Sequence, residues 1–180
     1  MTVFVTSDHH FNHENIIKFA GRHFESVLEM NAIMIENWNK TVKPNDIVWH
    51  LGDFWWKHGA GRSASGILSS LNGRISFIQG NHDPRGWGRD VWTLKVAGVH
   101  CVLFHYPIES WNNRLKGAVH IHGHTHRPQL VSARNRFNVC VEATGYKPVA
   151  VETLLALRER ESPPGEAAAA QKVTLGEFDW

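Results

Sequence analysis

Short hydrophobic runs recur along most of the chain, and each is followed by polar or turn-forming residues. They are rich in β-branched and aromatic residues and are too short for independent helices. This pattern predicts buried strands. The runs are residues 2–6, 46–51, 74–79, 99–104 and 118–122.

Further strands are predicted beside these runs. Residues 93–96 and the run that starts at Val99 flank Ala97-Gly98, a pair that favours the tight turn of a hairpin. Residues 137–141 and 149–151 are also rich in valine and predict two more strands.

Helical patterns occupy the intervals between the strands. Ser26 is typical of an N-cap, and it precedes an amphipathic segment. The apolar side chains of this segment are Leu28, Ile33, Ile35 and Trp38. Strands that alternate with helices predict a layered α/β sandwich with helices on both outer faces. Shorter helices are predicted at residues 14–20, 64–71 and 152–161.

The C-terminal residues differ in composition from the rest of the chain. Ser162-Pro163-Pro164-Gly165 interrupts regular structure, and four consecutive alanines from Ala167 form a low-complexity segment. A chain of 180 residues has the length of one domain. We therefore expect a single domain over residues 1–161, with residues 162–180 as a tail appended to it.

Composition and charge restrict the classes of function. With 42% hydrophobic and 20% charged residues, the chain is not wholly disordered. A net charge of +2 does not by itself indicate a nucleic-acid partner, although it does not exclude one. The sequence contains no apolar run of a membrane span and begins without a signal-peptide pattern, so we expect a cytoplasmic protein without membrane contact. No pattern predicts an oligomeric state.

The cysteines indicate a structural role, whereas some of the histidines indicate a functional one. Cys101 and Cys140 lie in apolar runs, which indicates small buried side chains rather than a disulfide framework. Histidine is a common metal ligand and carries protons near neutral pH, so the positions of the 13 histidines indicate candidate functional residues. Others are expected to be structural or hydrogen-bonded within strands, namely His9, His50, His120 and His122.

Each of the five main runs ends at a residue that can bind a metal ion. Ligands collect beyond the carboxyl ends of strands in α/β proteins, so these ends are expected to meet. Alternation along an extended segment would place Asp8 and His10 on one side and His9 on the other. Mixed nitrogen and oxygen donors suit Zn, Mn or Fe, and seven of them exceed one tetrahedral site. The seven are Asp8, His10, Asp53, Asn81, His105, His124 and His126.

The order of these motifs resembles that of the calcineurin-like metallophosphoesterases over residues 8–126. The motifs are Asp8-x-His10, Gly52-Asp53, Gly80-Asn81-His82-Asp83, His105 and Gly123-His124-Thr125-His126. Residues 10–17 also resemble small stand-alone prokaryotic and phage-type members. The resemblance implies a four-layer αββα sandwich with two mixed β-sheets and a dinuclear metal site at the carboxyl ends of the strands.

The resemblance also implies a role for each matching residue. Asp8, His10 and His126 would hold one metal. Asn81, His105 and His124 would hold the other, with Asp53 as the bridge. His82 would be the catalytic histidine, and Asp83 would orient it. One departure follows Asp53, where Phe54-Trp55-Trp56 replace a polar residue of many relatives. Packing of one or both of Trp55 and Trp56 in the core or under a loop is favoured over stacking on a nucleobase.

The implied activity is hydrolysis of phosphoester bonds by a hydroxide that bridges two divalent ions (Mn, Fe or Zn, with Mn active in vitro). We expect a phosphodiesterase acting on a nucleotide-type or other small phosphodiester. Efficient monoesterases commonly surround the dianion with arginines, and this chain offers no such cluster. Residues expected to contact substrate are His13, Arg62 and Arg127.

Other functions are weighed against this one. A phosphomonoesterase, a phosphoprotein phosphatase or a nuclease of the same superfamily would use the same metals. A scaffold member would bind a protein partner and would have a degraded metal site, but all seven ligands and His82 are retained here. The chain lacks the His-x-His-x-Asp-His motif of metallo-β-lactamase-like hydrolases, and metal storage would not need His82.

Overall fold

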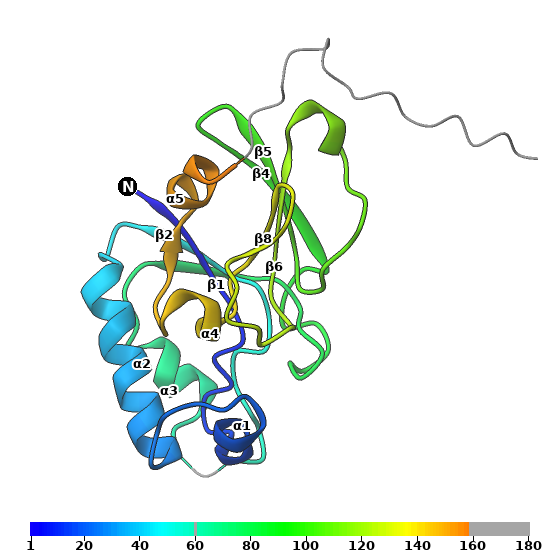
Figure 1. Ribbon diagram of the computed structural model, residues 1–180. Helices are drawn as coiled ribbons and strands as arrows, with labels where there is room; N and C mark the ends of the chain where they lie inside the picture. The colour runs from blue at the N-terminus through cyan, green and yellow to red at the C-terminus, as the bar shows by residue number, and fades with distance from the viewer. Residues whose placement is uncertain (60, 159–180) are drawn as a thin grey trace, which may run out of the picture.

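The computed structural model describes residues 1–59 and 61–158, which form two β-sheets with helices beside them (Figure 1). The first sheet has the order β3-β2-β1-β9 and the second has the order β4-β5-β6-β8-β7. The strands are β1 (Val3–Thr6), β2 (Ile47–His50), β3 (Arg74–Phe77), β4 (Val91–Val96), β5 (Val99–Phe104), β6 (Val119–His122), β7 (Val131–Ala133), β8 (Arg136–Asn138) and β9 (Val149–Ala150). The helices are α1 (Glu14–Phe19), α2 (Val27–Thr41), α3 (Ala64–Leu68), α4 (Val141–Thr144), α5 (Val151–Ala156) and the 3₁₀ helix η1 (Arg114–Lys116).

Both sheets are mixed, and their parallel strands end together. In the first sheet, β1, β2 and β3 run parallel and β9 runs antiparallel to them. In the second sheet, β5, β6 and β8 are parallel, and the edge strands β4 and β7 are antiparallel. The backbone of Val139 joins the two sheets, because its carbonyl accepts from Ser7 N at 3.0 Å and its N–H donates to His122 O at 2.8 Å. The carboxyl ends of β1 and β6 therefore lie next to each other.

One hydrophobic core lies between the first sheet and the helices α1 to α3 (Figure 1). Ser26 caps α2 as predicted, because its side-chain oxygen accepts a hydrogen bond from Glu29 N. The buried side chains of α2 are Met30, Met34 and Trp38, which share one face at a spacing of four residues. Leu28 is 67% exposed, so its predicted place on the buried face was wrong.

A second core fills the space between the two sheets. Val5 and Leu51 come from the first sheet and the residue after it, Ile121 and Phe137 from the second, and Leu154 from α5. These side chains are almost fully buried, which removes the apolar faces of both sheets from water.

The outer face of the second sheet carries a thin layer. His120 and His122 alternate with the core residues of β6 and therefore face outward, and the Trp111 ring lies 5.4 Å from the His120 ring. The segment that contains Trp111 and η1 covers this face. The predicted αββα sandwich with two mixed sheets is confirmed. In the described residues, its fourth layer is this largely irregular segment rather than a long α-helix.

Several element boundaries differ from the prediction. Residues 137–141 were predicted as one strand, but β8 ends at Asn138 and α4 begins at Val141. The cause is Asn138, whose side-chain oxygen accepts from Cys140 N at 3.1 Å and turns the chain. Likewise β9 ends at Ala150 and α5 begins at Val151. The predicted boundary at residue 161 and the tail 162–180 lie outside the described residues.

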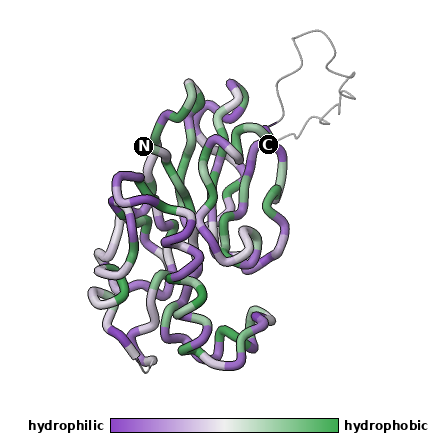
Figure 2. Tube along the Cα trace, turned by 90° about the vertical axis from the view of Figure 1, so that its left-hand side faces the viewer, coloured by the Kyte–Doolittle hydropathy of each residue, from purple (hydrophilic) through white to green (hydrophobic). Residues whose placement is uncertain are grey.

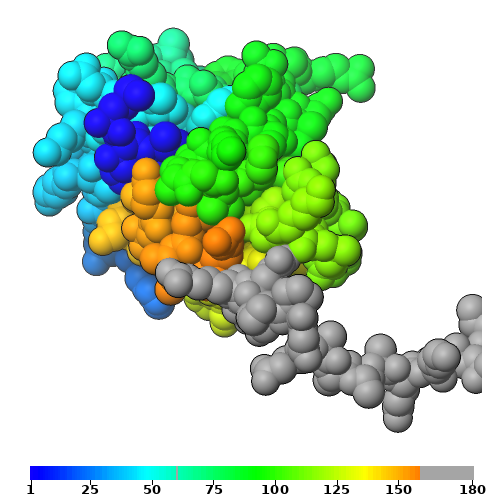
Figure 3. Space-filling view, turned by 90° about the horizontal axis from the view of Figure 1, so that it is seen from above, coloured from blue at the N-terminus to red at the C-terminus, as the bar shows by residue number. Residues whose placement is uncertain are grey.

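The start of the chain and its last described segment lie side by side (Figure 3). Phe4 pairs with Ala150 in the antiparallel contact of β1 and β9. Hydrophobic and hydrophilic segments alternate over short distances along the trace (Figure 2). Accordingly, none of the described helices combines the length and the hydrophobicity that crossing a membrane requires.

Candidate metal centre

Loops that follow five strands converge at the carboxyl ends of the two sheets. The loops after β1 and β2 are joined by backbone hydrogen bonds from Asp8 N to Gly52 O and from His10 N to Asp53 O, both 3.0 Å long. In the second sheet, Gly123 N donates to His105 O at 2.9 Å. These hydrogen bonds hold together the loops that carry the predicted ligands. The structure brings all seven predicted ligands together.

The backbone at the predicted ligands is not extended, which corrects the reasoning from strand alternation. Strand β1 ends at Thr6, and Asp8 and His10 have φ angles of 61° and 50°. Asp53, His124 and His126 also have positive φ angles. Left-handed conformations are uncommon outside glycine and gather at functional sites. His9 nevertheless points away from the centre, as predicted, and contacts the ring of Trp38.

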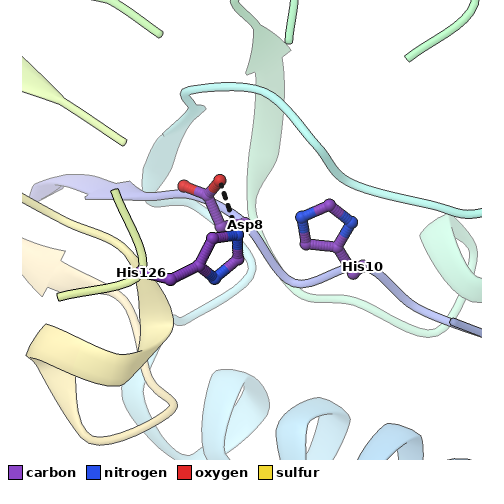
Figure 4. Close-up of side chains that lie close together, drawn as sticks. All are labelled: Asp8, His10 and His126. Atoms are coloured by element: carbon purple, nitrogen blue, oxygen red, sulfur yellow. Dashed lines mark ion pairs between the residues drawn. The ribbon is translucent and has the colours of Figure 1, made fainter. Parts of the chain in front are cut away.

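Asp8, His10 and His126 form one group, which we call the Asp8 cluster (Figure 4). Their candidate ligand atoms all lie within 4.8 Å of one another. His126 Nε2 is 3.7 Å from Asp8 Oδ1. Asp8 Oδ1 and His10 Nε2 are buried and have no hydrogen-bond partner among the described residues. Buried polar atoms are rarely left without partners, so this donor set fits a bound cation.

Asn81, His105 and His124 form a second group, the Asn81 cluster. Asn81 Oδ1 lies 2.9 Å from His105 Nε2 and 3.0 Å from His124 Nδ1. His105 Nδ1 donates to Leu51 O at 2.7 Å, which leaves Nε2 as the ring nitrogen that faces the amide oxygen. A cation shared by these atoms would satisfy both acceptors.

Asp53 lies between the two clusters. Its Oδ2 is 3.5 Å from His10 Nε2 and 3.6 Å from His105 Nε2. Its Oδ1 accepts a hydrogen bond of 2.8 Å from His82 N, which fixes the carboxylate. Burial, with the neighbouring carboxylate of Asp8, raises the pKa of Asp53 to about 7. The ionised form therefore needs nearby positive charge, which a divalent cation would supply.

His126 is held by Glu142, and Glu142 is held in turn by Arg22; the sequence analysis found neither residue. His126 Nδ1 lies 2.9 Å from Glu142 Oε1, and Arg22 Nη2 lies 2.8 Å from the same oxygen. Arg22 also donates to the backbone oxygens of His9 and Asp8 at 2.8 and 2.6 Å. Burial lowers the pKa of His126, but the Glu142 and Asp8 carboxylates raise it more, so the net shift is upward. Carboxylates commonly orient metal-binding histidines in this way.

All three motif glycines are required by close approach, and a Cβ atom added to Gly52 would collide with Gly80 and with the His105 ring. A Cβ atom added to Gly80 would collide with Asp53, and one added to Gly123 would collide with Asp8 and Ser7. Gly80 and Gly123 therefore let these two carboxylates lie against the backbone of neighbouring loops.

His82 lies at the exposed edge of the centre. Its ring centroid is 5.2 Å from that of His10 and 5.6 Å from that of Trp56. No hydrogen bond engages its ring in the part of the chain that the structure describes. Burial and the neighbouring His105 lower its pKa, which favours the neutral imidazole.

Asp83 is engaged differently from the expectation that it orients His82. Its carboxylate accepts three backbone hydrogen bonds, from Asp53 N at 2.8 Å and from Phe54 N and Gly80 N at 3.0 Å. Both of its oxygens are used, and within residues 1–59 and 61–158 no hydrogen bond joins it to the His82 ring. In the structure Asp83 connects the loops after β2 and β3.

The three predicted substrate contacts lie in different surroundings. His13 stacks on Trp56 at a centroid distance of 4.4 Å and is 5.5 Å from the His10 ring. The guanidinium of Arg62 is turned toward α3 and the turn after it, where it donates to Gly66 O and Ser70 Oγ. Arg127 is exposed and lines a cavity that His124 also lines.

The aromatic residues after Asp53 divide between core and site. Phe54 is fully buried and Trp55 packs against the same core, as expected for core packing. Trp56 instead lies against His13 and His82. The three aromatic residues that follow Asp53 therefore support the loop at the edge of the metal centre.

The four histidines expected to be structural, and both cysteines, lie in the interior, as predicted. His9 Nδ1 and His50 Nε2 are 2.9 Å apart in the interior. His120 Nδ1 donates to Val102 O, and His122 Nδ1 donates to Gly123 O. Cys101 and Cys140 are buried and free.

The fold and this arrangement of side chains are those of a calcineurin-like phosphoesterase. Residues 1–141 match the family model described as the calcineurin-like phosphoesterase superfamily domain, and the chain belongs to this superfamily. Membership confirms the predicted resemblance. The chemistry of the superfamily is metal-dependent hydrolysis of phosphoesters.

Particular relatives are also small proteins. The uncharacterized protein MJ1445 of Methanocaldococcus jannaschii is 38% identical over 164 residues, covering 88% of this chain and 92% of its own. The gene 66 protein of Mycobacterium phage L5 is 28% identical, covering 78% and 86%. Among solved structures, AQ665 of Aquifex aeolicus, a protein of unknown function, has a TM-score of 0.71 and 26% identity, covering 87% and 98%.

Proposed function

We propose that this protein hydrolyses phosphodiesters at a centre of two divalent ions. The Asp8 cluster would hold one ion, the Asn81 cluster would hold the other, and Asp53 would bridge them. The observation that carries this proposal is the position of Asp53 Oδ2, 3.5 Å from His10 Nε2 and 3.6 Å from His105 Nε2. One carboxylate oxygen is thus within reach of donors from both clusters.

The donor set agrees with the ions proposed. It contains carboxylate, amide and imidazole groups without thiolate, which suits Mn, Fe or Zn. When bound, two such ions would neutralise phosphoryl oxygens and make a water molecule acidic enough to react near neutral pH. We expect Mn²⁺ to support activity in vitro.

The charge of the seven proposed ligands favours an anionic substrate. Asp8 and Asp53 are their only carboxylates, and together they carry at most two negative charges. Two divalent ions carry four positive charges, so the loaded centre remains cationic and attracts phosphate.

His82 would act on the substrate from the exposed edge. Its ring is free of hydrogen bonds to the described residues and lies beside His10. A ring N–H at this position can donate a hydrogen bond to a phosphoryl oxygen, and the protonated ring can give a proton to the leaving oxygen. Asp53 contributes to this placement by accepting the hydrogen bond of His82 N.

The arginines support a diester rather than a monoester. Arg62 is occupied at α3, and of the described arginines Arg127 and Arg136 line the cavity beside His124. Efficient monoesterases usually hold the dianion that they cleave with several arginines at the metal centre, whereas these two arginines line the neighbouring cavity. A diester carries one negative charge and needs fewer, so we propose a small nucleotide-type diester as the substrate class.

The test compares two substrates with the same leaving group. Metal-stripped protein is reloaded with Mn²⁺, and kcat/KM is measured for bis(p-nitrophenyl) phosphate and for p-nitrophenyl phosphate. We expect the diester to be preferred. A monoester advantage of about tenfold, or about 1.4 kcal/mol in transition-state binding, contradicts the diester assignment. Loading of both ions without hydrolysis of either ester would instead support a scaffold role.

A further inference from the structure

A cavity of about 650 Å³ lies on the outer face of the second sheet, directly beside the candidate metal centre. His124 and Thr125 line it at the end next to the centre. Arg127, Ser132 and Arg136 line it farther along, from the loop after β6 and from β7 and β8. A molecule held at the Asn81 cluster could therefore extend into this cavity without leaving the surface of His124.

The cavity is basic. Its described lining contains two arginines and neither aspartate nor glutamate. Arg136 is paired with Glu109 at 2.6 Å, so its charge is partly balanced. Arg127 is exposed, and its guanidinium has no partner in the described part of the chain. Its positive charge is therefore available to a ligand in this cavity.

The wall that carries Arg136 is fixed by a chain of hydrogen bonds. Arg136 Nε donates to Ser132 Oγ at 3.3 Å, and Ser132 Oγ lies 2.7 Å from His122 Nε2. His122 Nδ1 donates to Gly123 O at 2.8 Å, so its Nε2 is the acceptor for the hydroxyl of Ser132. This chain of hydrogen bonds ends at Gly123, the residue before His124. The cavity wall and the proposed metal ligand are therefore parts of one connected structure.

We propose that this cavity binds a second phosphate, carried by the nucleoside arm of the diester, with Arg127 as its main contact. Guanidinium groups bind phosphate through paired, charge-assisted hydrogen bonds. The proposal rests on the proposed function, because the first phosphate must lie at the metal centre. It narrows the substrate class to nucleotide diesters that carry a phosphate besides the one that is cleaved.

Binding of two nucleotides that differ in one phosphate tests this inference. The Mn²⁺-loaded full-length chain is titrated with thymidine 5′-monophosphate and with thymidine 3′,5′-bisphosphate by calorimetry. We expect the bisphosphate to bind at least about tenfold more tightly, the size expected of hydrogen bonds to a charged group. Arg127→Ala should remove this preference. The control Arg74→Ala, an exposed arginine on the first sheet, should retain it.

Hydrolysis separates this inference from the proposed function. The p-nitrophenyl 5′-ester of thymidine 5′-phosphate is compared with the same ester bearing a 3′-phosphate. If the bisphosphate binds more tightly through Arg127 but neither ester is hydrolysed, the cavity assignment stands and the proposed activity fails. Equal binding of the two nucleotides, no binding of either, or a preference that survives Arg127→Ala would overturn the assignment.

Discussion

The two candidate metal clusters are built differently. The Asp8 cluster has a carboxylate of its own, and Asp8 and His10 are 0% and 2% exposed. In the Asn81 cluster an amide takes the place of the carboxylate, and Asn81 and His124 are exposed. Only His105 of that cluster is fully buried.

The contacts that support the ligands also differ, with charged groups at the Asp8 cluster and neutral groups at the Asn81 cluster. His126 of the Asp8 cluster is held by Glu142, and Glu142 is held by the buried Arg22. In the Asn81 cluster, His105 is oriented by a backbone carbonyl, and Asn81 and His124 contact each other. A charged and buried donor set binds a cation more tightly than an exposed neutral one. The comparison predicts one tightly held ion and one that exchanges with solvent.

The largest expected effect comes from removing the residue that the two clusters share. Asp53→Ala should lower the affinity of both sites and abolish measurable turnover, because its carboxylate lies between donors of both clusters. Elemental analysis after dialysis checks the metal content, and circular dichroism checks the fold. Retention of two tightly bound ions per chain would show that Asp53 is not the bridge.

His82 and His105 should separate catalysis from metal binding. His82→Ala should keep both ions and reduce kcat by about 10²–10⁴-fold, the range for a positioned acid or base. His105→Ala should weaken the ion at the Asn81 cluster, since its Nε2 faces Asn81. Metal content and kcat are measured for both variants. Loss of metal from His82→Ala as readily as from His105→Ala would reverse these roles.

A smaller effect is expected at Glu142, and it should fall on one cluster alone. Glu142→Gln removes the charge that orients His126, so metal affinity of the Asp8 cluster should fall by about 10–100-fold. Glu152→Gln changes an exposed glutamate on α5 and serves as the matched control. Competition with a chelator measures the affinity. An equal loss in the control, or a loss confined to the weaker ion, contradicts the role given to Glu142.

The candidate ligands were predictable because the information for them is local. Each motif follows a short strand, and parallel strands bring their carboxyl ends together whatever the intervening loops contain. The same locality explains the N-cap at Ser26. The left-handed backbone at Asp8 and His10 was missed because the alternation rule assumes an extended chain.

The residues that support the ligands were not predictable from the sequence. Glu142 reaches His126 only because the chain turns at Asn138 and begins α4 at Val141. Arg22 reaches Glu142 across 120 positions of the sequence. Asp83 follows His82 directly, yet its carboxylate is directed to backbone N–H groups of two loops. Such contacts depend on how distant segments pack together, and no local pattern in the sequence predicts that packing.

Titration of metal-free protein with Mn²⁺ tests the central claim most directly. Calorimetry counts the ions bound per chain while hydrolysis of bis(p-nitrophenyl) phosphate is followed in parallel samples. Two ions of unequal affinity should bind, and activity should rise only as the second, weaker site fills. Full activity with a single bound ion per chain would contradict the account.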